Sequence, residues 1–209
     1  MLSFLPLFPL NLVAYPGEVL NLHIFELRYR QLVNECIDEQ KTFGIPVYLN
    51  DNLPGFGTEV EIVALHKRYD DGRMDISTRG RRVFEVENFE NPVEGKLYAG
   101  GEVTFSTDLV DLSQPLPELL KLLDSLYELL SISVEYDKEA TQFSFQVAHR
   151  IGMSLDDEYQ LLTMPRESER QQFLIRHLQK VLPIVADMEH TKARIKLNGH
   201  FKNLDPLNF

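Results

Sequence analysis

The sequence is poor in several features that would point to a function. Its one cysteine, Cys36, excludes an internal disulfide. Its 32 acidic residues outnumber its 21 lysines and arginines, giving a net charge of −11. This charge argues against a nucleic-acid surface or an anionic membrane as a partner, because both attract clustered positive charge. No apolar run approaches the length of a membrane-spanning helix.

The N-terminus also lacks the features of a secretory signal peptide. No lysine or arginine precedes the first apolar residues, and Pro6 and Pro9 would interrupt a signal-peptide helix. We therefore expect a cytoplasmic protein that binds neither nucleic acid nor a membrane.

Sequence motifs of common catalytic sites are missing as well. Gly95-Lys96 lacks the leading glycine and the hydroxyl residue of a phosphate-binding loop. The segment Gly152-Met-Ser154 is better explained as a helix end followed by a helix N-cap than as a nucleophile elbow. The six histidines lack the short spacing to cysteine or carboxylate that zinc sites show. The sequence thus predicts no catalytic residue, no metal site and no cofactor.

The first 40 residues carry the clearest structural pattern. An apolar strand containing Pro6 and Pro9 belongs at a sheet edge or a barrel seam, because proline has no amide donor. Tyr15-Pro-Gly17 suits a type II turn, in which glycine accepts a positive φ. The apolar spacing then becomes helical and predicts a helix over residues 25–39. Its buried face is expected to contain Phe25, Tyr29, Leu32, Val33 and Cys36.

The remaining sequence predicts a sheet followed by helices. Residues 58–105 alternate apolar and polar side chains between frequent turns, which favours a closed or half-closed antiparallel barrel. Beyond the two prolines of residues 112–117, leucines recur with helical spacing. We therefore expect a β-barrel module with one helix over residues 1–112 and a helical bundle over residues 113–209. A kink or break is expected at Pro183, inside the last helix.

The order of these segments resembles a known family. The stretches Pro6-Leu-Phe-Pro-Leu10, Ala14-Tyr-Pro-Gly17 and Leu22-His-Ile-Phe-Glu-Leu-Arg-Tyr-Arg30 look like the opening of the Lon N-terminal domain family, the substrate-binding module of ATP-dependent Lon proteases. Phe43-Gly-Ile45, Asp71-Gly-Arg73 and Gly80-Arg-Arg-Val-Phe84 follow in the family's order, and residues 143–188 look like its helical second half. The resemblance implies an α+β fold: an irregular, mostly antiparallel β-barrel of PUA-like type, followed by a C-terminal helical bundle.

The resemblance also implies a binding function without catalysis. No segment of the sequence resembles the ATPase or the serine-lysine peptidase of Lon, so we expect a free-standing, non-enzymatic module. Its expected partners are polypeptide substrates or partner proteins, in keeping with an adaptor in protein quality control. A homo-oligomer is compatible with the sequence.

Apolar side chains in predicted turns are the candidates for the binding surface. They are Leu12, Tyr15, Pro16 and Phe56, the last at the end of the loop Leu53-Pro-Gly-Phe56. If these side chains are exposed, they form an interaction patch; if they are buried, they plug one end of the barrel. The sequence leaves both arrangements open.

Other functions remain as alternatives. A small-ligand site or an active site in the groove between barrel and helices would use charged residues such as Glu26, Arg28 or Arg79, and convergent polar groups in a deep pocket would support it. The basic residues of segments 67–68 and 79–82 could bind an acidic segment, although ion pairs with neighbouring carboxylates explain them more simply. Nucleic-acid binding, which the family's barrel would also suit, is disfavoured by the net charge.

Overall fold

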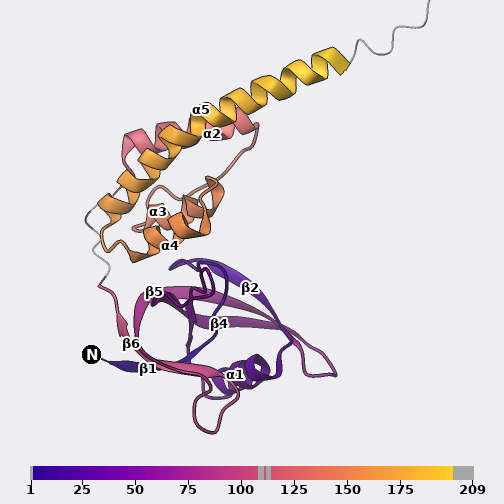
Figure 1. The fold of residues 1–209 in the computed structure, drawn as a ribbon, viewed down its shortest axis with the longest axis vertical. Helices are drawn as coiled ribbons and strands as arrows, with labels where there is room; N and C mark the ends of the chain where they lie inside the picture. Colours follow the sequence, from indigo (N-terminus) through magenta and orange to yellow (C-terminus); the bar gives the residue numbers. More distant parts are fainter. Residues whose placement is uncertain (1, 108–110, 112–113, 200–209) are drawn as a thin grey trace, which may run out of the picture.

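The computed structural model describes residues 2–107, 111 and 114–199, and it shows an α+β fold (Figure 1). The strands are β1 (Ser3–Leu7), β2 (Val19–Ile24), β3 (Phe43–Pro46), β4 (Phe56–Arg68), β5 (Met74–Glu90) and β6 (Ala99–Phe105). The helices are α1 (Leu27–Asp38), α2 (Pro117–Leu130), α3 (Phe143–Val147), the short 3-10 helix η1 (Ala148–Arg150), α4 (Leu155–Thr163) and α5 (Glu167–Gly199). We call residues 2–107 the sheet part and residues 114–199 the helical part.

The strands form one mixed sheet of six strands in the order β2-β5-β4-β3-β1-β6. β5 pairs with β6 as well as with β4 and β2, so the hydrogen-bonded ladder returns to β5. The β1–β3 pairing is parallel and has a single register pair, Leu7 with Gly44, whereas β1 pairs with β6 along its whole length. The proline-containing strand therefore lies where the ladder is thinnest, as its missing amide donors require.

The predicted helix near residue 25 is present but shorter, over Leu27–Asp38. Tyr29, Leu32, Val33 and Cys36 are buried on its inner face, as the sequence predicts. Phe25 is 60% exposed, so its expected burial is wrong. It precedes Glu26, the extended N-cap residue of α1, and therefore does not lie on the helical face.

Cys36 packs as a small core side chain, as its position on the apolar stripe indicates. It is 3% exposed and lies in the core beneath the sheet with Tyr29 and Phe43. Burial raises the pKa of the Cys36 thiol to about 12. The reactive thiolate is therefore disfavoured at neutral pH.

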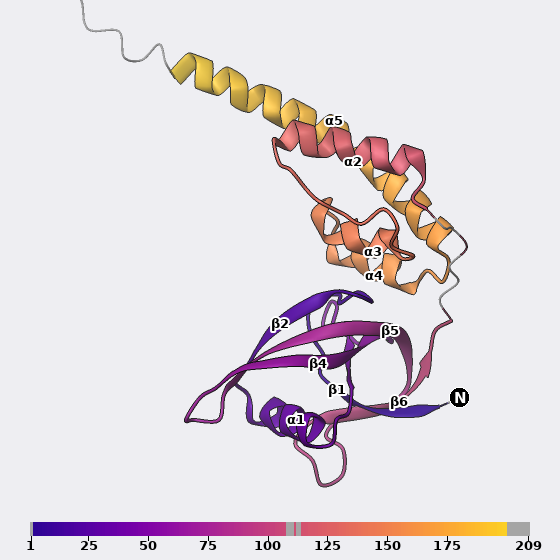
Figure 2. The same cartoon turned by 180° about the vertical axis from the view of Figure 1, so that it is seen from behind.

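The helical part shares its core with the sheet. α3 and α4 lie between the sheet and the pair of α2 and α5 in both views (Figures 1 and 2). Val13, Tyr15, Val47 and Val83 of the sheet part belong to the same buried cluster as the inner faces of the helices. The predicted boundary at residue 112 lies outside the described residues, and the division into two domains stays a prediction.

A buried ion pair within α5 is hydrogen-bonded to α3. The carboxylate of Glu167 accepts hydrogen bonds from the Ser144 amide (2.9 Å), the Ser144 hydroxyl (2.7 Å) and the Arg170 guanidinium (2.9 Å). Glu167 and Arg170 are each 1% exposed, and the guanidinium lies 4.3 Å from the ring centre of Phe145. Because the charges are paired and hydrogen-bonded, they are tolerated in the core.

The last helix differs from expectation at Pro183, because it continues through this residue without a break. At the start of the helix, Ser168 donates its amide and hydroxyl to the Asp111 carboxylate. Pro183 is exposed, so water can reach the carbonyl that has lost its amide donor.

Candidate functional site

Tyr15 lies at the junction between the sheet and the helices. The turn that carries it is formed as predicted, with the Glu18 amide donating to the Tyr15 carbonyl (3.1 Å) and Gly17 at φ +82°. The Tyr15 side chain is 0% exposed and stacks on Phe145, with ring centres 4.9 Å apart. Its hydroxyl donates to the Glu158 carbonyl (3.0 Å). Of the two arrangements that the sequence leaves open, Tyr15 therefore adopts the buried one.

The other three candidates are also packed to different degrees. Pro16 is buried, whereas Leu12 is half-buried against the core that α1 covers. Phe56 is half-buried, and its ring contacts Tyr159 of α4 edge to face at 6.4 Å. The Tyr159 hydroxyl donates to the Pro54 carbonyl (3.0 Å), which fixes this loop to the helical part. Tyr15 and Phe56 thus join the two parts of the molecule and do not form a shared exposed patch.

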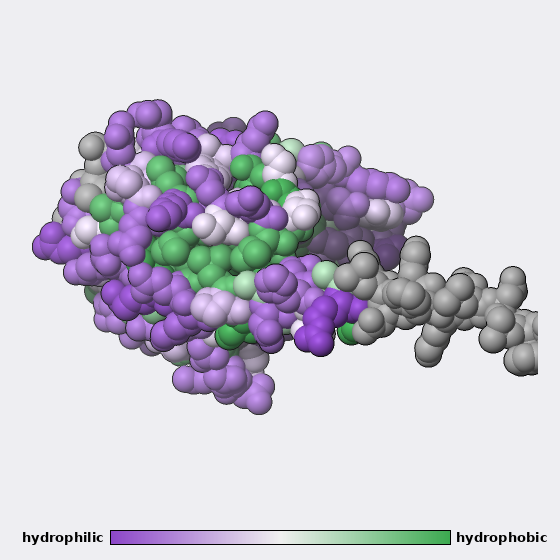
Figure 3. All heavy atoms as spheres, turned by 90° about the horizontal axis from the view of Figure 1, so that it is seen from above, coloured by the Kyte–Doolittle hydropathy of each residue, from purple (hydrophilic) through white to green (hydrophobic). Residues whose placement is uncertain are grey.

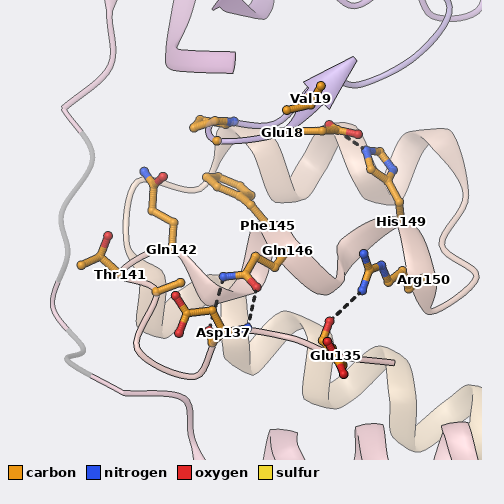
Figure 4. A pocket seen from close by; sticks show the side chains of 13 residues that line it. Glu18, Val19, Glu135, Asp137, Thr141, Gln142, Phe145, Gln146, His149 and Arg150 are labelled. Atoms are coloured by element: carbon orange, nitrogen blue, oxygen red, sulfur yellow. Dashed lines mark hydrogen bonds and ion pairs between the residues drawn. The ribbon is translucent and has the colours of Figure 1, made fainter. Parts of the chain in front are cut away.

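A groove of about 620 Å³ opens between the start of β2 and the segment leading into α3 (Figure 4). Polar side chains line the groove, but several of them form hydrogen bonds with other groups of the protein. Gln146 accepts from the Asp137 amide (3.1 Å) and donates to the Asp137 carbonyl (3.3 Å), and Arg150 donates to the Glu135 carbonyl (3.3 Å). These contacts hold residues 135–137 against α3 and η1.

His149 connects the two walls of this groove electrostatically (Figure 4). Its Nδ1 atom lies 2.7 Å from the Glu158 carboxylate and its Nε2 atom 3.2 Å from the Glu18 carboxylate. Burial lowers the pKa of His149, but the hydrogen bonds to Glu18 and Glu158 outweigh burial and raise it to about 9. The imidazole is therefore a cation at neutral pH that bridges two carboxylates, and it cannot act as a base there.

The residues named for a small-ligand site do not meet in this groove. Arg28 pairs with Glu26 (2.8 Å) at the start of α1, and neither they nor Arg79 line the groove. In the basic stretch, Arg81 and Arg82 pair with Glu61 (3.4 Å) and Glu59 (2.6 Å). The simpler explanation by ion pairs therefore holds for these two arginines.

A surface with exposed aromatic side chains lies on the sheet part where the loop after β3 meets the end of β5, and Arg28, Asn91 and Glu87 also line it. Two adjoining grooves, of about 430 and 440 Å³, share Tyr48, Leu53 and Phe89 as lining residues. Tyr48 is 39% exposed and Phe89 36% exposed. We call these three residues the Tyr48–Phe89 surface. Leu53 belongs to the predicted apolar loop, but Tyr48 and Phe89 were missed because they come together only through the loop and sheet geometry.

Apolar side chains also gather on the helical face that α2 and α5 form, seen from above in Figure 3. Large apolar residues that remain exposed in these elements and just after α2 are Leu130, Ile132, Ile184, Met188 and Ile195. In α5 these exposed large apolar residues are Ile184, Met188 and Ile195, in the half of the helix that extends away from the sheet (Figure 1).

Comparison with known proteins identifies the family to which this fold belongs. The family model of the ATP-dependent protease La (LON) substrate-binding domain matches residues 4–180. The chain belongs to the Lon substrate-binding domain family. A LON peptidase N-terminal domain and RING finger protein of Schizosaccharomyces pombe is 25% identical over 135 residues, which are 65% of this chain and 25% of that protein. The chain thus corresponds to about a quarter of the length of this relative.

Solved structures of Lon N-terminal domains share the fold. A Lon N-terminal domain protein from Xanthomonas campestris superimposes with a TM-score of 0.67 and 28% identity, covering 83% of this chain and 98% of that one. The N-terminal domain of Lon protease from the Mycobacterium avium complex gives a TM-score of 0.60 at 17% identity, covering 85% and 98%. The second likeness shows the fold alone. Among the described residues, no helix is long and apolar enough to cross a membrane.

Proposed function

We propose that the chain is a non-catalytic polypeptide-binding module that contacts its ligand through the Tyr48–Phe89 surface. The observation that carries this proposal is the pair of adjoining grooves lined by exposed aromatic side chains. The family supports the kind of ligand, because it is the substrate-binding domain of a protease, whose substrates are polypeptides.

The chemistry of the surface suits an unfolded segment. Tyr48 and Phe89 are rigid aromatic side chains, which lose little conformational entropy when they contact a partner. Their neighbours Pro9, Val86 and Ala99 add apolar lining to the two grooves. Shallow adjoining grooves favour an extended chain with several apolar side chains over a small molecule, which needs a more enclosing cavity.

The proposal also covers the elements that support the binding surface and the compartment in which the protein acts. The ladder that returns to β5 serves as a barrel-like support for the loop that carries Tyr48 and Leu53, and the helices form a bundle behind it. Phe56 follows Gly55 of the second groove and supports the loop from inside, whereas Tyr15 and Pro16 hold the junction. We place the module in the cytoplasm, as an adaptor that presents unfolded or damaged polypeptides.

The proposal can be tested with a permanently unfolded, carboxymethylated model protein carrying a fluorescent label. In the double variant Tyr48→Ser, Phe89→Ser we expect the Kd from fluorescence anisotropy to rise about tenfold or more, because two anchors are lost. The melting temperature should move by only a few degrees, since both side chains are more than a third exposed.

The control removes two apolar side chains from the helical face that are more exposed than Tyr48 and Phe89. The double variant Ile184→Ser, Met188→Ser should bind the unfolded protein like the wild type. Weaker binding in this α5 variant with unchanged binding in the Tyr48, Phe89 variant would place the contact on the helices. A wild-type protein that does not bind the unfolded probe would refute the function itself.

A further inference from the structure

Strand β2 has one unpaired edge. It pairs with β5 over six consecutive residues, from Val19 with Arg79 to Ile24 with Met74, without a register shift. It is the end strand in the order of the sheet, with β5 as its one neighbour among the described residues. An edge of this kind presents backbone donors and acceptors to a further strand.

The hydrogen bonds at the start of β2 show which residues point outward. The Gly80 amide donates to the Glu18 carbonyl (2.9 Å), so residue 18 faces β5. Backbone groups of an antiparallel strand alternate in direction, so Leu20, Leu22 and Ile24 face β5 too. The hydroxyl of Thr78, which reaches the Leu20 carbonyl (3.2 Å), agrees with this alternation. The amides and carbonyls of residues 19, 21 and 23 therefore point away from the sheet.

This edge lacks the usual features that prevent strand addition. The sequence of β2, Val-Leu-Asn-Leu-His-Ile, contains no proline, lysine or carboxylate. By contrast, the second half of β4 continues beyond its pairing with β3, and it contains Lys67 and Arg68 and shows register shifts against β5. Bulges and charges discourage pairing at such an edge, so the regular edge of β2, which contains no lysine, arginine or carboxylate, is the more receptive one.

We infer that the open edge of β2 is a docking site for an extended polypeptide segment, which adds to the sheet as a further strand. This inference rests on the proposed function and gives it a second, backbone-directed contact. The ligand is a segment without proline that has apolar side chains at alternate positions. Those side chains would continue the row of Leu20 and Leu22, which are half-buried against the core.

The groove beside Val19, at the start of β2, adds a preference for the charge of the ligand. Val19 both begins β2 and lines the groove of Figure 4, so an added strand that passes Val19 enters that groove. His149 is shared there between Glu18 and Glu158, and Glu135 and Asp137 outnumber Arg150. A ligand with lysine or arginine at this end is therefore favoured over an acidic one.

A labelled peptide, Lys-Val-Thr-Val-Thr-Val-Lys, provides the probe. Two N-methylated forms, one at the valines and one at the threonines, each block one edge of the peptide and leave the side chains unchanged. If the peptide adds to β2, one N-methylated form should bind about tenfold more weakly or worse, because the blocked amides face β2. The other form should keep the affinity of the parent peptide. Equal binding of all three peptides would show that no backbone pairing occurs and would overturn the inference.

Variants of Asn21 test the protein side. Asn21→Pro removes an outward amide and places the proline ring in the path of a partner strand, whereas Asn21→Ala keeps the amide. Both variants lose the hydrogen bond that the Ser77 hydroxyl donates to the Asn21 side chain, so they are matched. We expect peptide affinity to fall about tenfold in Asn21→Pro relative to Asn21→Ala, with both proteins folded by circular dichroism. Equal affinities would overturn the inference. If Asn21→Pro fails to fold, binding of the N-methylated peptides to the wild-type protein tests the inference instead.

Pairing of two copies through β2 is the competing use of this edge. Light scattering over a range of concentrations would reveal a dimer, and a dimer that Asn21→Pro dissociates but the peptide does not would assign the edge to a second copy. Failure of the inference remains distinct from failure of the proposed function. In the first case the unfolded probe still binds in a manner that depends on Tyr48 and Phe89, and in the second it does not.

Discussion

Replacing Tyr15 with alanine should destabilise the protein strongly. The side chain is 0% exposed, its ring stacks on Phe145 at 4.9 Å, and it also contacts the His149 ring at 4.7 Å. Truncating a fully buried aromatic residue costs about 3 to 5 kcal/mol through lost burial and the cavity left behind. Loss of the hydrogen bond to the Glu158 carbonyl adds about 1 kcal/mol.

Thermal unfolding followed by circular dichroism measures this effect. In a protein of about this size, each kcal/mol lowers the melting temperature by about 2 to 4 °C, so Tyr15→Ala should lower it by at least about 6 °C. Tyr15→Phe keeps the stacking and should cost about 1 kcal/mol. Tyr48→Ala, on a side chain that is 39% exposed, is the control and should cost less than about 1 kcal/mol. If Tyr15→Ala melts within about 2 °C of the wild type and loses polypeptide binding, Tyr15 is a contact residue and the packing argument fails.

Three further outcomes follow from the same contacts. Because the pKa of His149 is raised to about 9 from an ordinary 6.5, its stabilisation should be complete below pH 6.5 and lost as pH rises through 9; melting curves of wild type and His149→Gln should therefore converge at high pH. Glu167→Gln removes the buried carboxylate that pairs with Arg170 and accepts from Ser144, and it should cost about 3 to 5 kcal/mol in urea unfolding, whereas a loss below 1 kcal/mol would contradict the importance of this pair. Phe25→Ala should cost less than about 1 kcal/mol and Leu32→Ala about 2 to 5 kcal/mol, so equal melting shifts would mean that the face of α1 is misassigned.

Local chemistry was sufficient to predict much of the fold. The turn at residues 15–18, the hairpin between β4 and β5 and the inner face of α1 each depend on residues close in sequence. The ion pair of Glu167 and Arg170 was not predicted, because the reason for burying it lies in Ser144 and Phe145, more than 20 residues earlier in the chain.

The binding candidates show why sites are harder to predict than strands. The sequence places the aromatic residue Tyr15 in a turn and the aromatic residue Phe25 on the buried face of a helix, yet Tyr15 is 0% and Phe25 60% exposed. The difference is that the helical part covers Tyr15, and no local pattern reveals which face of a sheet a distant helix will cover.

The same long-range packing holds the helices in a fixed position against the sheet. Tyr15 of the sheet part stacks on Phe145 of α3, the Arg170 guanidinium of α5 lies over the same ring, and Arg170 is paired with Glu167. A continuous row of buried contacts thus runs from the sheet to the longest helix. Buried groups of this kind have few alternative arrangements, because truncating any one leaves a cavity or breaks a buried ion pair. The row fixes α3 and η1 beside the start of β2, and with them the helical wall of the groove that a strand added to β2 would enter.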